Sequence, residues 1–219
     1  MVLAQYKELV GTAAAVTTIG QFLSPLFVCK KIVKNGSAKG MDPMPFIGGM
    51  AMSVLFLQYG IIIDDPAMIP VNIFGFVLNV AYSICFYMYT TEKTEFLSSV
   101  GKVSAVTAVL VGYALWEKQD LVEFRFGMIV TVLMLALIGA PLFSLGEIIK
   151  NKSTESLPFP MIAAGTVVST LWLLYAIIIE NVFMQVQNIV ALLLCLIQLS
   201  LFVIYPSTQP KVVEEKKKK

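Results

Sequence analysis

The chain has 219 residues, of which 58% are apolar and 14% charged, with a net charge of +2 and a mean hydropathy of +0.81. A soluble domain carries about 25% charged residues, so this composition excludes a protein surrounded by water on all sides. The apolar runs are continuous and do not alternate with polar residues as the strands of a membrane barrel do. The sequence therefore predicts an all-α integral membrane protein.

Seven stretches are long and apolar enough to cross a membrane, which requires about 20 residues each. In chain order they are Leu9–Cys29, Pro43–Ile63, Met68–Thr90, Val100–Trp116, Phe126–Leu145, Pro158–Ile179 and Val182–Tyr205. The fourth is the shortest, and we expect Lys102 near its start to extend toward a membrane interface.

The second half of the chain repeats the first at an offset of 116 residues. The residues that align without a gap include Gly127 with Gly11, Pro141 with Pro25, Ser169 with Ser53, Tyr175 with Tyr59, and Asn188 with Asn72. Self-similarity at a fixed long offset indicates a duplicated structural unit. We therefore predict two triple-helix bundles, residues 1–93 and 122–206, joined by a linker helix in residues 94–121 and followed by a tail in residues 207–219. Because three helices plus one return the chain to its starting side, this 3+1+3 layout makes the bundles parallel repeats.

Lysines gather in alternate loops and so predict the orientation of the chain. They are Lys30, Lys31, Lys34, Lys39, Lys93, Lys150, Lys152 and the final four residues. The positive-inside rule places these loops and the C-terminus in the cytosol and the N-terminus on the extracellular or lumenal side. The lysine-rich tail suits contact with anionic membrane lipid. We expect the plasma membrane as the host, with the Golgi or another endomembrane as the alternative.

No Asp, Glu, Lys or Arg lies well inside any predicted span, and the chain contains no histidine. Charged groups within the membrane mark proton relays and ion-coupled carriers, so their absence argues against proton coupling, anionic substrates and most enzymes. The three cysteines, Cys29, Cys85 and Cys195, fit small buried apolar residues better than metal or disulfide chemistry. We predict no cofactor and no metal, and no nucleic-acid partner because no stretch combines basic and aromatic residues. A transported solute should be neutral.

Asn72 and Asn188 occupy equivalent places near the start of the third helix of each repeat. An amide supplies two donors and an acceptor oxygen, which suits the vicinal hydroxyls of a sugar held from both sides of a two-fold axis. The alternative is that each asparagine only bonds between helices or lies at the interface. Their pairing favours the binding role.

Phe56 and Trp172 align in the same way, each three residues before a tyrosine, Tyr59 or Tyr175. An aromatic face suits the C–H side of a pyranose. For the tyrosines, anchoring at the membrane interface is an equally good interpretation.

Prolines recur at matching places in the two repeats. Pro25 and Pro141 align inside the first helices, where proline removes a hydrogen bond and kinks the helix. In a membrane the freed carbonyls must find partners on neighbouring helices or in cavity water, so these two look like hinges. Pro45 and Pro158 begin the second helices, where proline is also ordinary N-terminal chemistry.

The chain resembles the SWEET (MtN3/saliva) family of sugar transporters from Gly11 to Pro206. The likeness lies in the 3+1+3 layout, the four bending prolines, the paired asparagines and the segment Lys150-Asn-Lys-Ser-Thr-Glu-Ser-Leu-Pro-Phe-Pro160. It implies a fourth helix packed on the first bundle, a sugar pocket between the bundles, and passive bidirectional uniport by rocking about the prolines. The short loops resemble animal members more than plant members.

Carried over by position, the resemblance implies a sugar pocket containing Asn72, Asn188 and Trp172 and an extracellular gate at Tyr59. The hinge prolines it implies are Pro25, Pro45, Pro141 and Pro158. Phe56 stands where plant members often carry a small residue, which favours a monosaccharide such as glucose. Asn181 stands where some members carry the aspartate that partners the gate tyrosine, so the sequence leaves Tyr59 without an identified partner.

Two other functions fit the same architecture. A PQ-loop amino-acid exporter would carry glutamine after the kink prolines, but Pro25 and Pro141 are each followed by leucine. A non-transporting receptor or scaffold that reads a carboxylate would place arginines in the cavity, and the spans contain none. An enzyme is the weakest hypothesis, because no nucleophile–base pair lies in the spans. The sequence neither requires nor excludes a homo-oligomer.

Overall fold

The computed structural model describes residues 4–154 and 157–205, with the side chains of residues 140–145 and 147 outside this description. A short 3-10 helix, Ala4–Tyr6, precedes eight α-helices in this part of the chain. They are α1 (Lys7–Phe22), α2 (Leu26–Asn35), α3 (Met44–Ile62), α4 (Met68–Tyr89), α5 (Lys93–Trp116), α6 (Gln119–Asn151), α7 (Phe159–Ile178) and α8 (Val182–Ile204). With α1 and α2 counted as one, 7 helical segments are long and apolar enough to cross a membrane. The expected all-α membrane architecture is confirmed.

Three of the predicted spans are clearly shorter than the helical segments that contain them. The first segment continues through α2 to Asn35 rather than ending at Cys29. α5 begins at Lys93 rather than Val100, and α6 runs from Gln119 to Asn151 rather than from Phe126 to Leu145. Hydropathy detects only the apolar part of a helix that lies in the lipid. The helix itself continues into polar residues as long as its backbone hydrogen bonds continue. The division into residues 94–121 and 122–206 stays a prediction, and α6 begins before the second boundary.

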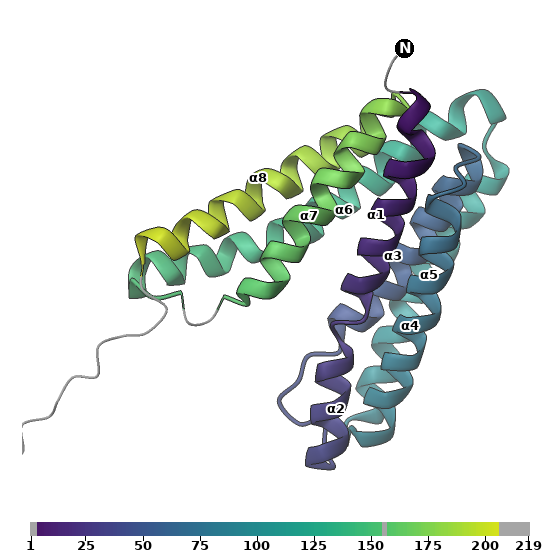
Figure 1. The fold of residues 1–219 in the computed structure, drawn as a ribbon. Coiled ribbons are helices and arrows are strands. Elements are labelled where there is room, and N and C mark those ends of the chain that lie inside the picture. The colour runs from purple at the N-terminus through teal and green to yellow at the C-terminus, as the bar shows by residue number, and fades with distance from the viewer. Residues whose placement is uncertain (1–3, 155–156, 206–219) are drawn as a thin grey trace, which may run out of the picture.

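Figure 1 shows the helices in two groups that meet near the N-terminus and diverge toward α2. In the first group α4 contacts α1, α2 and α3, and α5 packs against α3. In the second group α8 contacts α6 and α7. Across the groups α1 packs against α7, and α3 packs against α6. We call α1–α5 the first half, α6–α8 the second half, and the end where they meet the closed end.

The backbone keeps the sequence repeat. Asp64 and Glu180, which are 116 residues apart, end α3 and α7 with positive φ angles of 51° and 58°. Gly36 and Lys152 stand in the same relation after α2 and α6, with φ angles of 63° and 50°. Non-glycine residues seldom adopt this conformation, so its recurrence at equivalent positions shows one folding unit used twice.

The first membrane segment breaks at Pro25. α1 ends at Phe22 and α2 begins at Leu26, whose N–H donates to the Leu23 carbonyl at 3.1 Å instead of continuing the α-helical ladder. The Phe22 carbonyl freed by this break accepts a hydrogen bond from the hydroxyl of Tyr82 on α4 at 2.8 Å. The neighbouring helix thus supplies the partner that the membrane cannot.

The second repeat differs at the equivalent place. α6 remains one continuous helix through residue 141. The side chain of Pro141 lies outside the described residues, so its hinge role stays a prediction.

A polar cluster joins α5 to α6 at the closed end. The Glu117 carboxylate accepts hydrogen bonds from the Tyr113 hydroxyl at 2.7 Å and from Arg125 Nη1 at 2.6 Å. The bond from Tyr113, the backbone N–H of Lys118 and the bond from Arg125 together lower the pKa of Glu117 to about 2. The carboxylate therefore stays ionised at neutral pH and ties the linker helix to the start of the second half.

Replacing Tyr82 with phenylalanine should destabilise the protein by about 1 kcal/mol, because the partly buried Phe22 carbonyl would lose its donor. We expect a lower thermal unfolding midpoint for Tyr82→Phe in detergent. Tyr87→Phe is the matched control, since Tyr87 lies on the same helix, its ring packs on Phe96, and its hydroxyl makes no hydrogen bond to the described residues. Equal midpoints for Tyr82→Phe and wild type would show that the Phe22 carbonyl needs no donor from α4.

Candidate functional site

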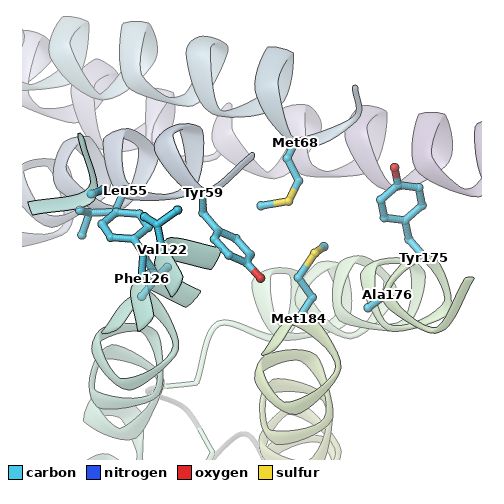
Figure 2. Close-up of a cluster of buried hydrophobic side chains, with 10 residues drawn as sticks. Leu55, Tyr59, Met68, Val122, Phe126, Tyr175, Ala176 and Met184 are labelled. Carbon is cyan, nitrogen blue, oxygen red and sulfur yellow. The ribbon is translucent and has the colours of Figure 1, made fainter. Parts of the chain in front are cut away.

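Two tyrosines bind across the halves at the closed end. The side-chain nitrogen of Asn181, which precedes α8, donates to the hydroxyl of Tyr59 on α3 at 2.8 Å. The hydroxyl of Tyr175 on α7 donates to Oδ2 of Asp65, which precedes α4, at 2.7 Å. Both tyrosines are at most 1% exposed. In Figure 2 Tyr59 points from the first half toward the second, and Tyr175 points the opposite way.

The two bonds are equivalent by the repeat, since Asp65 and Asn181 are also 116 residues apart. Asn181 is thus the partner that the sequence left unidentified for Tyr59. A tyrosine hydroxyl both donates and accepts, so Tyr59 accepts from the amide of Asn181, whereas Tyr175 donates to the carboxylate of Asp65. Asp65 was not predicted, although its alignment with Asn181 was a usable signal.

Both partner side chains are held in place by helix starts. Oδ1 of Asp65 accepts from the backbone N–H groups of Ala67 and Met68 at 3.0 and 2.8 Å. Oδ1 of Asn181 accepts from the N–H of Met184 at 2.9 Å. One atom of each side chain caps a helix, and the other reaches the tyrosine, so the cross-half bonds start from fixed positions.

Glycines make room for the two tyrosine rings. A Cβ on Gly11 of α1 would lie 2.8 Å from the ring of Tyr175. A Cβ on the equivalent Gly127 of α6 would lie 2.8 Å from the ring of Phe183 and 3.0 Å from that of Tyr59. No larger residue fits without displacing an aromatic ring, which explains why this glycine appears in both repeats.

A cavity of about 430 Å³ lies between the halves. Ligand pockets for small molecules commonly measure about 300–1,000 Å³. All four residues predicted to bind substrate line it, namely Phe56, Asn72, Trp172 and Asn188. Polar residues not assigned to the site in advance line it as well, namely Thr18, Gln21, Ser53, Ser169, Gln187 and Gln198.

The two asparagines present their amides in the same way. Nδ2 of Asn72 donates to the Met68 carbonyl at 2.9 Å, and Nδ2 of Asn188 donates to the Met184 carbonyl at 2.8 Å. Each bond lies within one helix, so neither asparagine bridges helices. In the described part of the chain, no other group hydrogen-bonds to either amide. One N–H and the oxygen of each amide are therefore available to a ligand.

Trp172 is fixed at the wall of the cavity. Its indole N–H donates to the hydroxyl oxygen of Thr18 on α1 at 2.8 Å. Its ring meets that of Tyr175 edge-on, with centroids 5.6 Å apart and planes at 85°. The cavity wall therefore touches the closed end through neighbouring aromatic rings on α7.

Three of the four predicted hinge prolines lie at helix ends. Pro25 separates α1 from α2, Pro45 lies in the first turn of α3, and Pro158 immediately precedes α7. Their roles as hinges stay predictions.

A protein-family model described as "Sugar efflux transporter for intercellular exchange" matches residues 8–94 and 124–210. The matched segments begin and end 116 residues apart, which is the offset of the internal repeat. The chain belongs to the SWEET (MtN3/saliva) family. The resemblance stated from the sequence is thus confirmed.

Curated SWEET relatives match most of this SWEET chain. "Sugar transporter SWEET1" of Drosophila pseudoobscura pseudoobscura is 36% identical over 91% of this chain and 89% of its own. "Sugar transporter SWEET1" of Caenorhabditis elegans is 29% identical over 91% of this chain and 66% of its own. "Bidirectional sugar transporter SWEET9" of Arabidopsis thaliana is 28% identical over 90% of this chain and 78% of its own. These relatives are named as transporters and not as enzymes, in agreement with the sequence analysis.

One solved structure shares the SWEET fold. It is titled "The 3.7 A resolution structure of a eukaryotic SWEET transporter" and superposes with a TM-score of 0.85 at 22% identity. The match covers 95% of this chain and 100% of that chain.

Removing the Tyr175 hydroxyl should loosen the closed end more than removing that of Tyr59. Tyr175→Phe leaves the buried carboxylate of Asp65 short of a partner, and bonds to charged groups are worth about 1.5–3 kcal/mol against about 1 for neutral ones. Spin labels at Ile61 and Ile177, two exposed and equivalent positions, would report the distance between halves in a background without native cysteines. We expect Tyr175→Phe to show a population with a longer distance between the labels. Tyr59→Phe should show the same population, but in a smaller fraction of molecules.

Tyr82→Phe is the control for this experiment, because it removes a phenol hydroxyl whose hydrogen bond to Phe22 stays within the first half. It should leave the distance distribution unchanged. If Tyr175→Phe also leaves it unchanged, the Tyr175–Asp65 bond does not hold the halves together.

Proposed function

We propose that this protein is a passive, bidirectional uniporter of neutral sugars that works by alternating access. The carrying observation is the pair of equivalent amides, Asn72 and Asn188, in one cavity between two parallel repeats. The cavity is closed at one end by the tyrosine bonds, and the halves diverge at the other end (Figure 1). Rocking of the halves would close the open end and open the closed one.

The chemistry of the lining suits a sugar. A hydroxyl group both donates and accepts, so the free oxygen and N–H of each amide match neighbouring hydroxyls. Phe56 and Trp172 supply apolar rings for the C–H face of the sugar ring. Because Asn72 belongs to the first half and Asn188 to the second, one bound sugar would contact both moving parts.

The same lining supports transport without ion coupling. Among the described residues no charged side chain lines the cavity. Without an acidic or basic side chain in the cavity, protons have no binding site beside the solute through which to drive it. A free amino acid would also find no partner for either of its charges, which disfavours the PQ-loop alternative.

Cavity size supports a monosaccharide such as glucose as the substrate. The volume of about 430 Å³ is near the lower end of the usual range for ligand pockets, and the bulky Phe56 occupies one wall. The relatives named as sugar transporters support the substrate class and leave the particular sugar to experiment.

The orientation follows from the lysines at the diverging end. Lys30, Lys31 and Lys34 lie on α2, and Lys150 and Lys152 lie at the end of α6. The positive-inside rule places this end in the cytosol, so the structure would represent the inward-open state, with the tyrosines forming the extracellular gate. We propose the plasma membrane as the host, with membrane lipid around the helices.

Labelled glucose should enter cells lacking their own hexose carriers in a saturable way when they express this protein. Uptake and efflux should both occur and should not change with external pH, since no acidic, lysine, arginine or histidine side chain among the described residues lines the cavity. Asn72→Ala and Asn188→Ala should each lower uptake by roughly tenfold at equal surface expression, because each loses hydrogen bonds to the sugar. Asn79→Ala is the control, since Asn79 makes the same bond one turn back along α4, to Gly75, and does not line the cavity.

Three outcomes would contradict these proposals separately. No flux of glucose, fructose or sucrose by a folded, surface-expressed protein would reject sugar transport. Flux that survives both asparagine substitutions would keep the function and reject the site. Flux that rises with a proton gradient would reject uniport.

A further inference from the structure

The hydrogen bond between Thr18 and Trp172 crosses the cavity wall from one half to the other. Thr18 lies on α1 and Trp172 on α7, and the bond of 2.8 Å joins the hydroxyl oxygen to the indole N–H. Thr18 is 8% exposed, and both residues line the cavity. The bond therefore fixes a substrate-facing ring to a helix of the opposite half.

The geometry leaves this corner of the cavity without a free donor. The Thr18 hydroxyl donates to the Ala14 carbonyl at 2.7 Å, which directs its oxygen lone pairs away from the helix axis and toward the indole. An indole has a single donor and no acceptor, and that donor is already bound to Thr18. Trp172 can therefore offer a solute only the apolar surface of its ring.

The equivalent positions of the other repeat cannot make this bond. Met134 is equivalent to Thr18 and Phe56 is equivalent to Trp172, and both line the cavity. Phenylalanine has no N–H and methionine has no hydroxyl. A methionine side chain is flexible, so the first-repeat counterpart of Trp172 lacks the hydrogen bond that holds the tryptophan ring in one orientation.

We propose that Thr18 is a positioning residue for substrate specificity, which acts by holding the Trp172 ring against the cavity and keeping its N–H away from the solute. Fixing the ring selects sugars whose C–H face matches it. Breaking the bond frees the ring to reorient. The exposed indole N–H can then donate to sugars whose hydroxyl groups are arranged differently. The selectivity part of this inference rests on the proposed sugar transport, whereas the positioning of the ring does not.

Ring positioning can be measured without any sugar. The chain has two tryptophans, so a Trp116→Phe background leaves Trp172 as the sole emitter. In purified protein Thr18→Val should lower the fluorescence anisotropy of Trp172, because the ring gains motion. Thr18→Ser should keep the wild-type value, since it retains the hydroxyl. Thr17→Val is the matched control, because the adjacent hydroxyl of Thr17 bonds to Ala13 and Ala14 and not to the indole.

Transport kinetics test the consequence for specificity. At matched surface expression Thr18→Val should raise the KM for glucose by roughly three- to tenfold, the effect of one hydrogen bond. The ratio of the KM for galactose to the KM for glucose should move closer to one. The maximal rate should change less than KM, and Thr18→Ser should restore both values. In a Trp172→Phe background Thr18→Val should have no further effect on KM.

The outcomes separate the two proposals. Wild-type anisotropy in Thr18→Val would overturn the positioning role whatever the transport result. Lowered anisotropy with unchanged KM and unchanged discrimination would overturn the specificity role. Lowered anisotropy in a protein that moves no sugar would leave the ring positioned by Thr18 and reject the proposed function. If Thr18→Val does not reach the membrane, Thr18→Cys serves as the second variant, since a thiol is a weak acceptor of similar size.

Discussion

The structure depends on one joint, the two tyrosine hydrogen bonds that connect the halves at the closed end. Tyr59 with Asn181 and Tyr175 with Asp65 are the same bond made twice. The helix caps that hold Asp65 and Asn181 give these bonds a fixed starting geometry. The halves are joined there and their helices diverge toward the other end (Figure 1), so the cavity between them is closed on the side of the tyrosines.

Within the membrane, buried polar groups cannot hydrogen-bond to water, so they must hydrogen-bond to other groups of the protein. In the described residues, no buried side-chain nitrogen or oxygen lacks a hydrogen-bond partner. Tyr82 binds the carbonyl freed at the Pro25 break, and Gln187 binds Thr131 between α8 and α6 at 2.7 Å. The amides of Asn72 and Asn188 differ because each keeps part of its bonding capacity for the cavity. That unused capacity distinguishes a binding group from a packing group.

The repeat register was the strongest signal in the sequence. It predicted the doubled architecture and the four cavity residues that the structure brings together, whereas the seven spans were predicted from their apolar length alone. Asp65 was missed because charged residues were sought inside the spans, and this one lies in a loop that folds back to cap α4. The Thr18–Trp172 contact joins residues 154 apart in sequence, and helix periodicity carries no information about which helices of different halves meet. The end of α2, the start of α5 and both ends of α6 were placed too far inward because polar helical turns leave no hydropathy signal.

Each gate contact also takes one partner from either copy of the repeat. Tyr59 of the first copy bonds to an amide of the second, and Tyr175 of the second copy bonds to a carboxylate of the first. The glycine that packs on each tyrosine ring also belongs to the other copy. A single copy by itself would hold a tyrosine without its hydrogen-bond partner and a glycine without the tyrosine ring that packs on it. Two identical copies related by a two-fold axis would satisfy both, since such an interface is self-complementary. The duplicated chain thus has the contact pattern of a symmetric dimer whose subunits have been joined by one helix, and α5 is that covalent link.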